Sequence, residues 1–93
     1  MTQPLFRTED LPFAAYLHAT HKLRFLGCEP VGETGRVAFI FSDPANESDK
    51  MIVDFESGAE CPAAAFYDSI RHLRRVMDRT RSKEQDEHKS PRR

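Results

Sequence analysis

Arginines are the residues of this chain whose type and spacing could do chemistry. Five of them lie close together near the C-terminus: Arg71, Arg74, Arg75, Arg79 and Arg81. A guanidinium group binds phosphate oxygens in pairs, so such a row is typical of a nucleic-acid contact. We name these five as candidate nucleic-acid ligands, with Arg71, Arg75 and Arg79 as the expected phosphate contacts.

Two other interpretations of the arginine row stay open. Asp68 could pair with Arg71 or His72, and Asp78 with Arg74 or Arg75, which would make the row an ordinary solvated helix face. The row could also receive an acidic protein. The sequence pI of about 6.4 argues against nucleic acid, because dedicated binders are usually basic overall.

Histidines and cysteines give a weaker signal. His18 and His21 are three residues apart, whereas Cys28 and Cys61 have no ligand-type neighbour close in sequence. Zinc sites usually show paired ligands at short, repeated spacings. We therefore predict no metal and no cofactor. We expect the histidines to lie on the surface and the two cysteines to be small buried hydrophobic residues.

No pattern of catalytic residues is visible. The serines lie outside any nucleophile-elbow motif, and the glycine-containing segment VGETG at residues 31–35 lacks the Lys-Ser/Thr ending of a phosphate-binding loop. The prediction is that the protein is not an enzyme.

The composition indicates one small domain whose charge is distributed unevenly along the chain. The chain has 93 residues, of which 39% are hydrophobic and 31% charged, and its net charge is −1. Residues 1–62 hold five Lys or Arg against ten Asp or Glu, a net −5, whereas residues 63–93 hold nine against five, a net +4. Such a split can mark an anionic partner for the basic half, or two halves that attract each other.

The chain shows no sign of a membrane segment. No apolar run approaches the roughly 20 residues that a spanning helix needs, and the N-terminus lacks the pattern of a secretory signal. We expect a cytoplasmic protein without membrane contact. The predicted organisation is a flexible N-terminus over residues 1–7, a single domain over 8–82 and a disordered charged tail over 83–93.

The segment over residues 61–82 must position the arginines. Its large apolar residues recur at helical spacing, at Phe66, Ile70, Leu73 and Met77, and Tyr67 and Val76 widen this stripe. The pattern predicts a long amphipathic helix that begins near Pro62 and presents its arginines on the opposite face. We expect Phe66, Ile70 and Leu73 to be buried together with Phe39 and Phe41.

The preceding segments predict a hairpin between shorter helices. A helix is expected from an N-cap at Thr8 to about residue 20, followed by apolar strands over residues 23–28 and 36–42 joined by a glycine-containing turn. A further helix, capped by Ser42 or Asp43, should reach residue 57; a strand over Met51–Phe55 is the alternative. The predicted fold is a single α+β domain in the order α-β-β-α-α, with the β-hairpin covered by the last helix.

Several short motifs occur in a recognisable order. They are the D-L-x-x-A-A-x-L helix at 10–17, the strand at 22–27, the V-x-F-x-F strand at 37–41, Asp43-Pro44, the stop at 55–58 and F-Y-D-S-I-R-x-L-R at 66–74. This arrangement resembles a family of short bacterial and phage-associated proteins known only as a domain of unknown function. The resemblance implies a shared fold and, through the association with mobile elements, adds to the expectation of nucleic-acid binding.

The functional prediction is a small non-enzymatic binding or accessory module that contacts nucleic acid through the basic face of the C-terminal helix. The alternative is a protein-interaction adaptor, or a subunit of a larger complex. In that case the hairpin edge or the acidic N-terminal half would recruit the partner.

Overall fold

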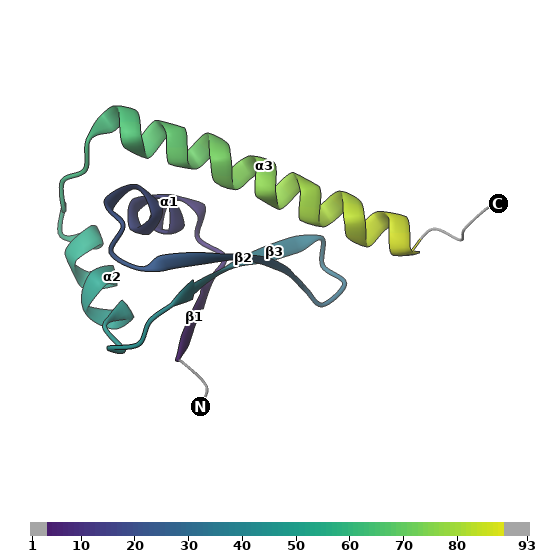
Figure 1. The fold of residues 1–93 in the computed structure, drawn as a ribbon, viewed down its shortest axis with the longest axis horizontal. Helices are drawn as coiled ribbons and strands as arrows, with labels where there is room; N and C mark the ends of the chain where they lie inside the picture. Colours follow the sequence, from purple (N-terminus) through teal and green to yellow (C-terminus); the bar gives the residue numbers. More distant parts are fainter. Residues whose placement is uncertain (1–3, 89–93) are drawn as a thin grey trace.

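The computed structural model describes residues 4–88, and the side chains of residues 4–82. Its elements are β1 (Leu5–Thr8), α1 (Leu11–Thr20), β2 (Arg24–Val31), β3 (Arg36–Ser42), α2 (Ser48–Glu56) and α3 (Ala63–His88). The α+β class and the order α-β-β-α-α are confirmed, with one additional strand, β1, in front. Figure 1 shows α1 between the sheet and the long helix α3.

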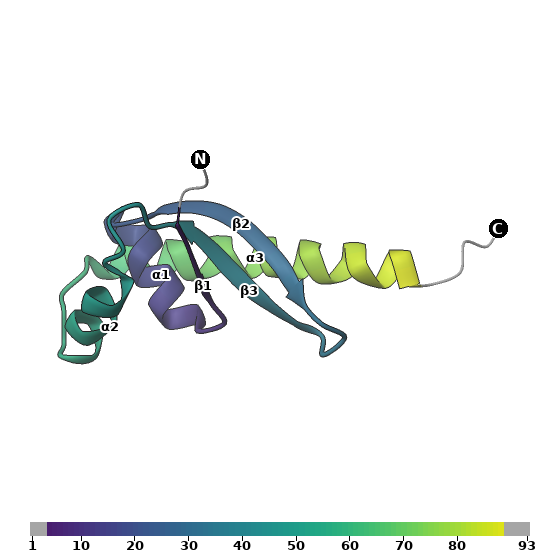
Figure 2. The same cartoon turned by 90° about the horizontal axis from the view of Figure 1, so that it is seen from below.

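The sheet is antiparallel and has the strand order β1-β3-β2, so β3 lies in the middle. Phe39 and Phe41 of β3 turn towards α1 and are 1% and 0% exposed. In the part of the chain that the structure describes, no helix covers the opposite face of the sheet (Figure 2). Two ion pairs join segments of the sheet and its surroundings. Arg7 of β1 reaches across β3 to Glu29 of β2 at 2.8 Å, and Arg36 of β3 pairs with Glu9, which follows β1, at 3.3 Å.

The prediction of a flexible N-terminus over residues 1–7 is wrong for residues 5–7, because they form β1. Phe6 pairs with Phe41, and its ring packs edge-on against Phe13 at 5.8 Å. The amide of Asp43 donates to the carbonyl of Pro4. This strand joins partners more than thirty residues away, so local periodicity could not reveal it. Residues 1–3 lie outside the described part.

Strand β2 runs further than its apolar pattern predicted. It continues through Pro30 to Val31, and Pro30 is tolerated because β2 is an edge strand, where an N–H can be absent without loss of a ladder bond. Between Phe25 and Gly27 the register shifts by an inserted residue, Leu26. Gly27 has φ of 137°, a conformation that side-chain-bearing residues rarely adopt.

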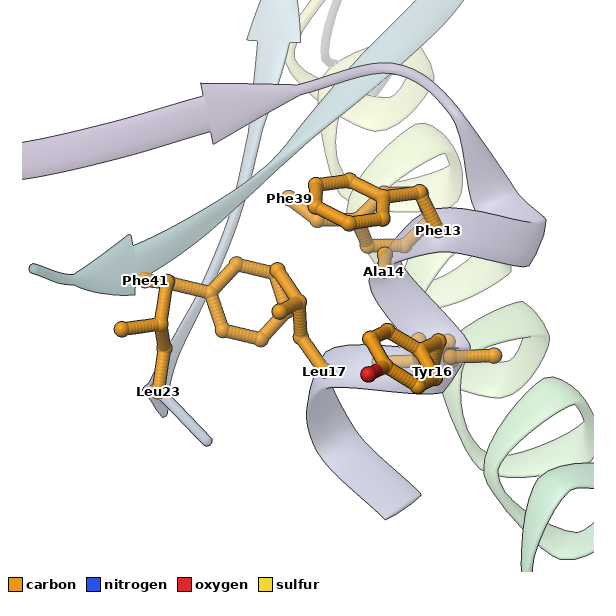
Figure 3. Close-up of a cluster of buried hydrophobic side chains, with 9 residues drawn as sticks. Phe13, Ala14, Tyr16, Leu17, Leu23, Phe39 and Phe41 are labelled. Atoms are coloured by element: carbon orange, nitrogen blue, oxygen red, sulfur yellow. The ribbon is translucent and has the colours of Figure 1, made fainter. Parts of the chain in front are cut away.

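Helix α1 is the centre of the hydrophobic core. Its residues 13–17, Phe-Ala-Ala-Tyr-Leu, are all at most 3% exposed, because the sheet, α2 and α3 surround the helix. Figure 3 shows Leu17 beside Phe41 and Leu23, and Phe13 beside Phe39. The N-cap is Asp10 and not the predicted Thr8: Asp10 Oδ1 accepts from the amide of Phe13 at 3.2 Å.

The long helix α3 covers the hairpin only in part. It packs mainly on α1 and, further along, on β2 and β3 (Figure 1). Leu73 is completely buried, whereas Phe66, Ile70 and Met77 are half-buried at the edge of the core. The predicted cluster is therefore confirmed for Phe39, Phe41 and Leu73, and the other two predicted members flank it.

Residues Ser48–Glu56 form helix α2, so the strand alternative for Met51–Phe55 is wrong. The predicted cap Asp43 acts five residues before the helix starts. Its Oδ1 accepts from the amide of Glu47 at 2.9 Å and its Oδ2 from the amide of Ser48 at 3.1 Å. Pro44 consequently lies in the connecting turn, before the helix begins at Ser48.

Replacing Asp43 by alanine should lower the free energy of unfolding by about 1–2 kcal/mol, because the amides of Glu47 and Ser48 lose their acceptors. Asp43 is 3% exposed, so water cannot readily replace the carboxylate. Urea unfolding would measure the change. Asp43→Asn keeps one oxygen acceptor and should lose less, and an equal loss for both variants would contradict the capping role.

Helix α3 continues to His88, six residues beyond the predicted domain boundary at 82. The predicted disordered tail is therefore wrong for residues 83–88, and residues 89–93 lie outside the described part. Within residues 4–88, no helix is both long and apolar enough to cross a membrane.

Candidate nucleic-acid interface

The outward face of α3 carries three of the predicted arginines in one row. Arg71, Arg75 and Arg79, called here the basic ridge, are four residues apart and all exposed. Residues at this spacing follow one another along a helix surface, about 6 Å apart along the axis. None of the three forms an ion pair with another side chain among residues 4–82. The ridge therefore presents unneutralised guanidinium groups to solvent.

Of the other two predicted arginines, only Arg74 is free to act with the ridge. It is exposed and lies beside Arg75. Arg81 has a structural role instead: its Nε donates to the carbonyl of Gly35 at 2.9 Å, which fastens α3 to the turn between β2 and β3. Sequence alone could not separate Arg81 from the ridge, since its partner lies 46 residues away.

The carboxylates among the described side chains of α3, those up to residue 82, leave the ridge positive. Asp78 lies 3.9 Å from Nη1 of Arg81, and not beside Arg74 or Arg75 as the solvated-face interpretation requires. Asp68 has no ion pair among the described side chains either. The local charge is thus that of four free arginines against one free aspartate.

Tyr67 begins the same row, one turn before Arg71. Tyr67 was predicted to widen the apolar stripe, but its side chain is 62% exposed. The guanidinium carbon of Arg71 lies 5.6 Å from the centre of the ring, a cation–π arrangement. Its spacing of four residues from Arg71 was the signal that could have placed it on the outer face.

Histidines gather where α1 meets α3. His21 is exposed, as predicted, whereas His18 is half-buried and not on the surface. The ring of His18 stacks on that of His72 at 5.1 Å and 28°. Its Nδ1 is hydrogen-bonded to Oγ of Ser69 at 2.8 Å, and Ser69 is 4% exposed. The ring of His21 lies 6.5 Å from that of His18. His18 therefore links the two principal helices.

The environment of His18 disfavours its charged form. Partial burial lowers the pKa of His18 from its ordinary value of 6.5, and positive charge on His72 and His21 lowers it further. The hydrogen bond to Ser69 survives in either protonation state, because a hydroxyl can both donate and accept. The cost of protonation therefore comes from desolvation and from the other two histidines.

Stability should fall as the pH drops below 6.5. Because the pKa of His18 is lower in the folded protein than in the unfolded chain, the unfolded chain binds this proton more tightly. The stability that neutral His18 contributes is fully present above pH 6.5. It is lost as the pH falls through the folded-state pKa of His18. Melting temperatures between pH 7.5 and 5 should show this decline, and His18→Gln should flatten it. Parallel profiles for the two proteins would contradict the assignment.

The cysteines are less buried than predicted. Both are half-buried and reduced, and they pack against the core. Burial raises the pKa of the Cys28 thiol to about 11, so this sulfur stays protonated at neutral pH. Within the described residues, no three His, Cys, Asp or Glu side chains are placed to hold a metal ion.

No protein-family model matches the chain, and neither the curated proteins nor the solved structures contain a significant match. Function is therefore inferred from the geometry of α3 and its neighbours.

Proposed function

We propose that the protein binds single-stranded nucleic acid through the outward face of α3. The observation that carries the proposal is the basic ridge, three exposed arginines in line with no carboxylate partner among the described side chains. Arginine is well suited to phosphate because its planar fork donates two parallel hydrogen bonds. The ridge spans about 12 Å from Arg71 to Arg79, which is enough to follow several successive phosphates.

Tyr67 supports a single strand as the partner. An exposed aromatic ring beside a positive track is the combination that holds unpaired bases, since each base can stack while its phosphate meets an arginine. Arg71 already lies over Tyr67, so stacking and phosphate contact would occur side by side. A duplex keeps its bases stacked inside and cannot use the ring in this way.

The test is fluorescence anisotropy of a labelled single-stranded oligonucleotide at several salt concentrations. Three phosphate contacts should give a slope of log affinity against log salt of about −2, since each contact on a single strand contributes about −0.7. A duplex of the same sequence should bind more weakly. If the protein is folded by circular dichroism and yet fails to bind at low salt, the proposal is wrong.

A protein partner is the second candidate. The observation that favours it is the edge strand β1, whose Leu5 is 51% exposed beside a sheet face that carries no helix in the described part. An extended peptide could add to this edge by backbone hydrogen bonds. Such an interface is held by backbone hydrogen bonds between uncharged groups, so its affinity would depend little on salt, unlike that of the ridge.

A further inference from the structure

The three clustered histidines adjoin the basic ridge without belonging to it. His72 lies on α3 three residues before Arg75 and seven before Arg79, so it occupies the flank of the ridge. His18 stacks on His72 from α1, and His21 lies close to His18. The end of α1 and the middle of α3, far apart in sequence, thus bring three imidazoles together.

A hollow opens beside this cluster. It has a volume of about 410 Å³ and is lined by His18, His21, Leu23, Arg24 and Phe25. The ring of Phe25 lies edge-on to His18 at 5.9 Å and to His72 at 6.4 Å, which makes one wall aromatic. Arg24, at the start of β2, also lines the hollow. Its volume falls within the range of about 300–1,000 Å³ found for ligand pockets.

The titratable and charged residues that line the hollow are all basic: His18, His21 and Arg24. His18 faces His21, which directly follows α1, and His72 on α3. The nearest carboxylate along α3 is Asp68, four residues before His72, and no carboxylate is among the described residues that line the hollow. When the imidazoles gain protons, no carboxylate that lines the hollow balances their positive charge. An external anion can then do so.

We infer that the hollow beside His18, His21, His72 and Arg24 is a second phosphate subsite, which extends the basic ridge and is occupied when the histidines are protonated. The inference rests on the proposed function and adds its regulation: nucleic-acid binding tightens as the pH falls. Histidine ordinarily changes charge near pH 6.5, within the physiological range. The lowered pKa of His18 is consistent with this, because a bound phosphate would relieve the repulsion among the three histidines.

The experiment compares the affinity for a labelled single-stranded oligonucleotide at pH 7.5 and pH 5.5 at fixed ionic strength. Uptake of one proton on binding changes affinity by about tenfold per pH unit across the window where that proton is exchanged. The affinity of the wild type should therefore be at least about tenfold higher at pH 5.5 than at pH 7.5. Addition of inorganic phosphate at pH 5.5 should also shift the ring NMR signals of His21 and His72.

The test variant combines His21→Asn and His72→Gln and keeps His18, so the hydrogen bond to Ser69 is preserved. Asparagine tolerates the left-handed conformation of residue 21, whose φ is 57°. The variant should lose most of the pH effect and keep its affinity at pH 7.5. The matched control is His88→Gln, which changes the fourth histidine of the chain and should keep the pH effect. Should the double variant fail to fold, His72→Gln alone serves the same comparison.

The outcomes separate the inference from the proposed function. Equal affinity at both pH values, or a pH effect that persists in the double variant, overturns the phosphate subsite and leaves binding to the ridge intact. If the wild type binds only at pH 5.5 and the double variant does not bind, the result supports the subsite as the dominant contact. An absence of binding at both pH values overturns both.

Discussion

Replacing Leu73 by alanine should lower the free energy of unfolding by about 2–5 kcal/mol. Leu73 is 0% exposed and belongs to the cluster in which α3 meets Leu17 of α1 and Phe41 of β3. The substitution removes buried apolar surface and leaves a cavity that the rigid neighbours cannot fill. For a domain whose total stability is about 5–15 kcal/mol, the loss is severe.

Urea unfolding followed by circular dichroism would measure the effect of Leu73→Ala. The matched control is Leu5→Ala, the same chemical change at a side chain that is 51% exposed, and it should cost less than about 1 kcal/mol. Similar losses for the two variants, or a loss below about 0.5 kcal/mol at Leu73, would show that the inner stripe of α3 is not its core face.

Reversing the charge of Arg71, Arg75 and Arg79 to glutamate should reduce the affinity for single-stranded nucleic acid by at least about a hundredfold at low salt. Hydrogen bonds to charged groups contribute about 1.5–3 kcal/mol each, so the loss of even two such contacts is sufficient. The salt slope should also become shallower by about 2, which is about 0.7 for each lost contact. The fold should survive, because all three side chains are exposed.

Single reversals provide the matched comparison for the triple variant. Arg75→Glu and Lys50→Glu change the net charge equally, but Lys50 is exposed on α2 and lies outside the ridge. Arg75→Glu should weaken binding by about tenfold, whereas Lys50→Glu should leave the affinity nearly unchanged. Equal effects would indicate a response to overall charge, and the ridge would then be an ordinary solvated surface.

The elements with a strong local signal were predictable from the sequence. The stripe at Phe66, Ile70, Leu73 and Met77 follows the helical repeat, and the structure places it along the inner side of α3. The apolar run over residues 37–41 likewise predicted a strand, and the structure shows it as β3, with residues on both of its faces buried. In both segments the local run of apolar residues was sufficient to indicate the element.

Helix α1 carries no such signal, although it is the centre of the core. It is apolar on every side because the sheet, α2 and α3 surround it, and a helix buried all round has no amphipathic stripe. Its length and composition therefore did not reveal that it forms the centre of the core. Strand β1 was missed for a related reason: four residues gain stability only by pairing with β3, more than thirty residues away.

The candidate site likewise has features that the sequence predicts and features that only the folded structure shows. The sequence by itself determined that α3 has a basic outer face, since residues four apart on a helix must share one side. Only the tertiary structure decided that Arg81 is bound to the Gly35 carbonyl, 46 residues away. It also brought His18 against His72, because the packing of α1 on α3 joins positions 54 residues apart. A residue's helical phase follows from local geometry, whereas its partners across the fold follow from how the elements pack.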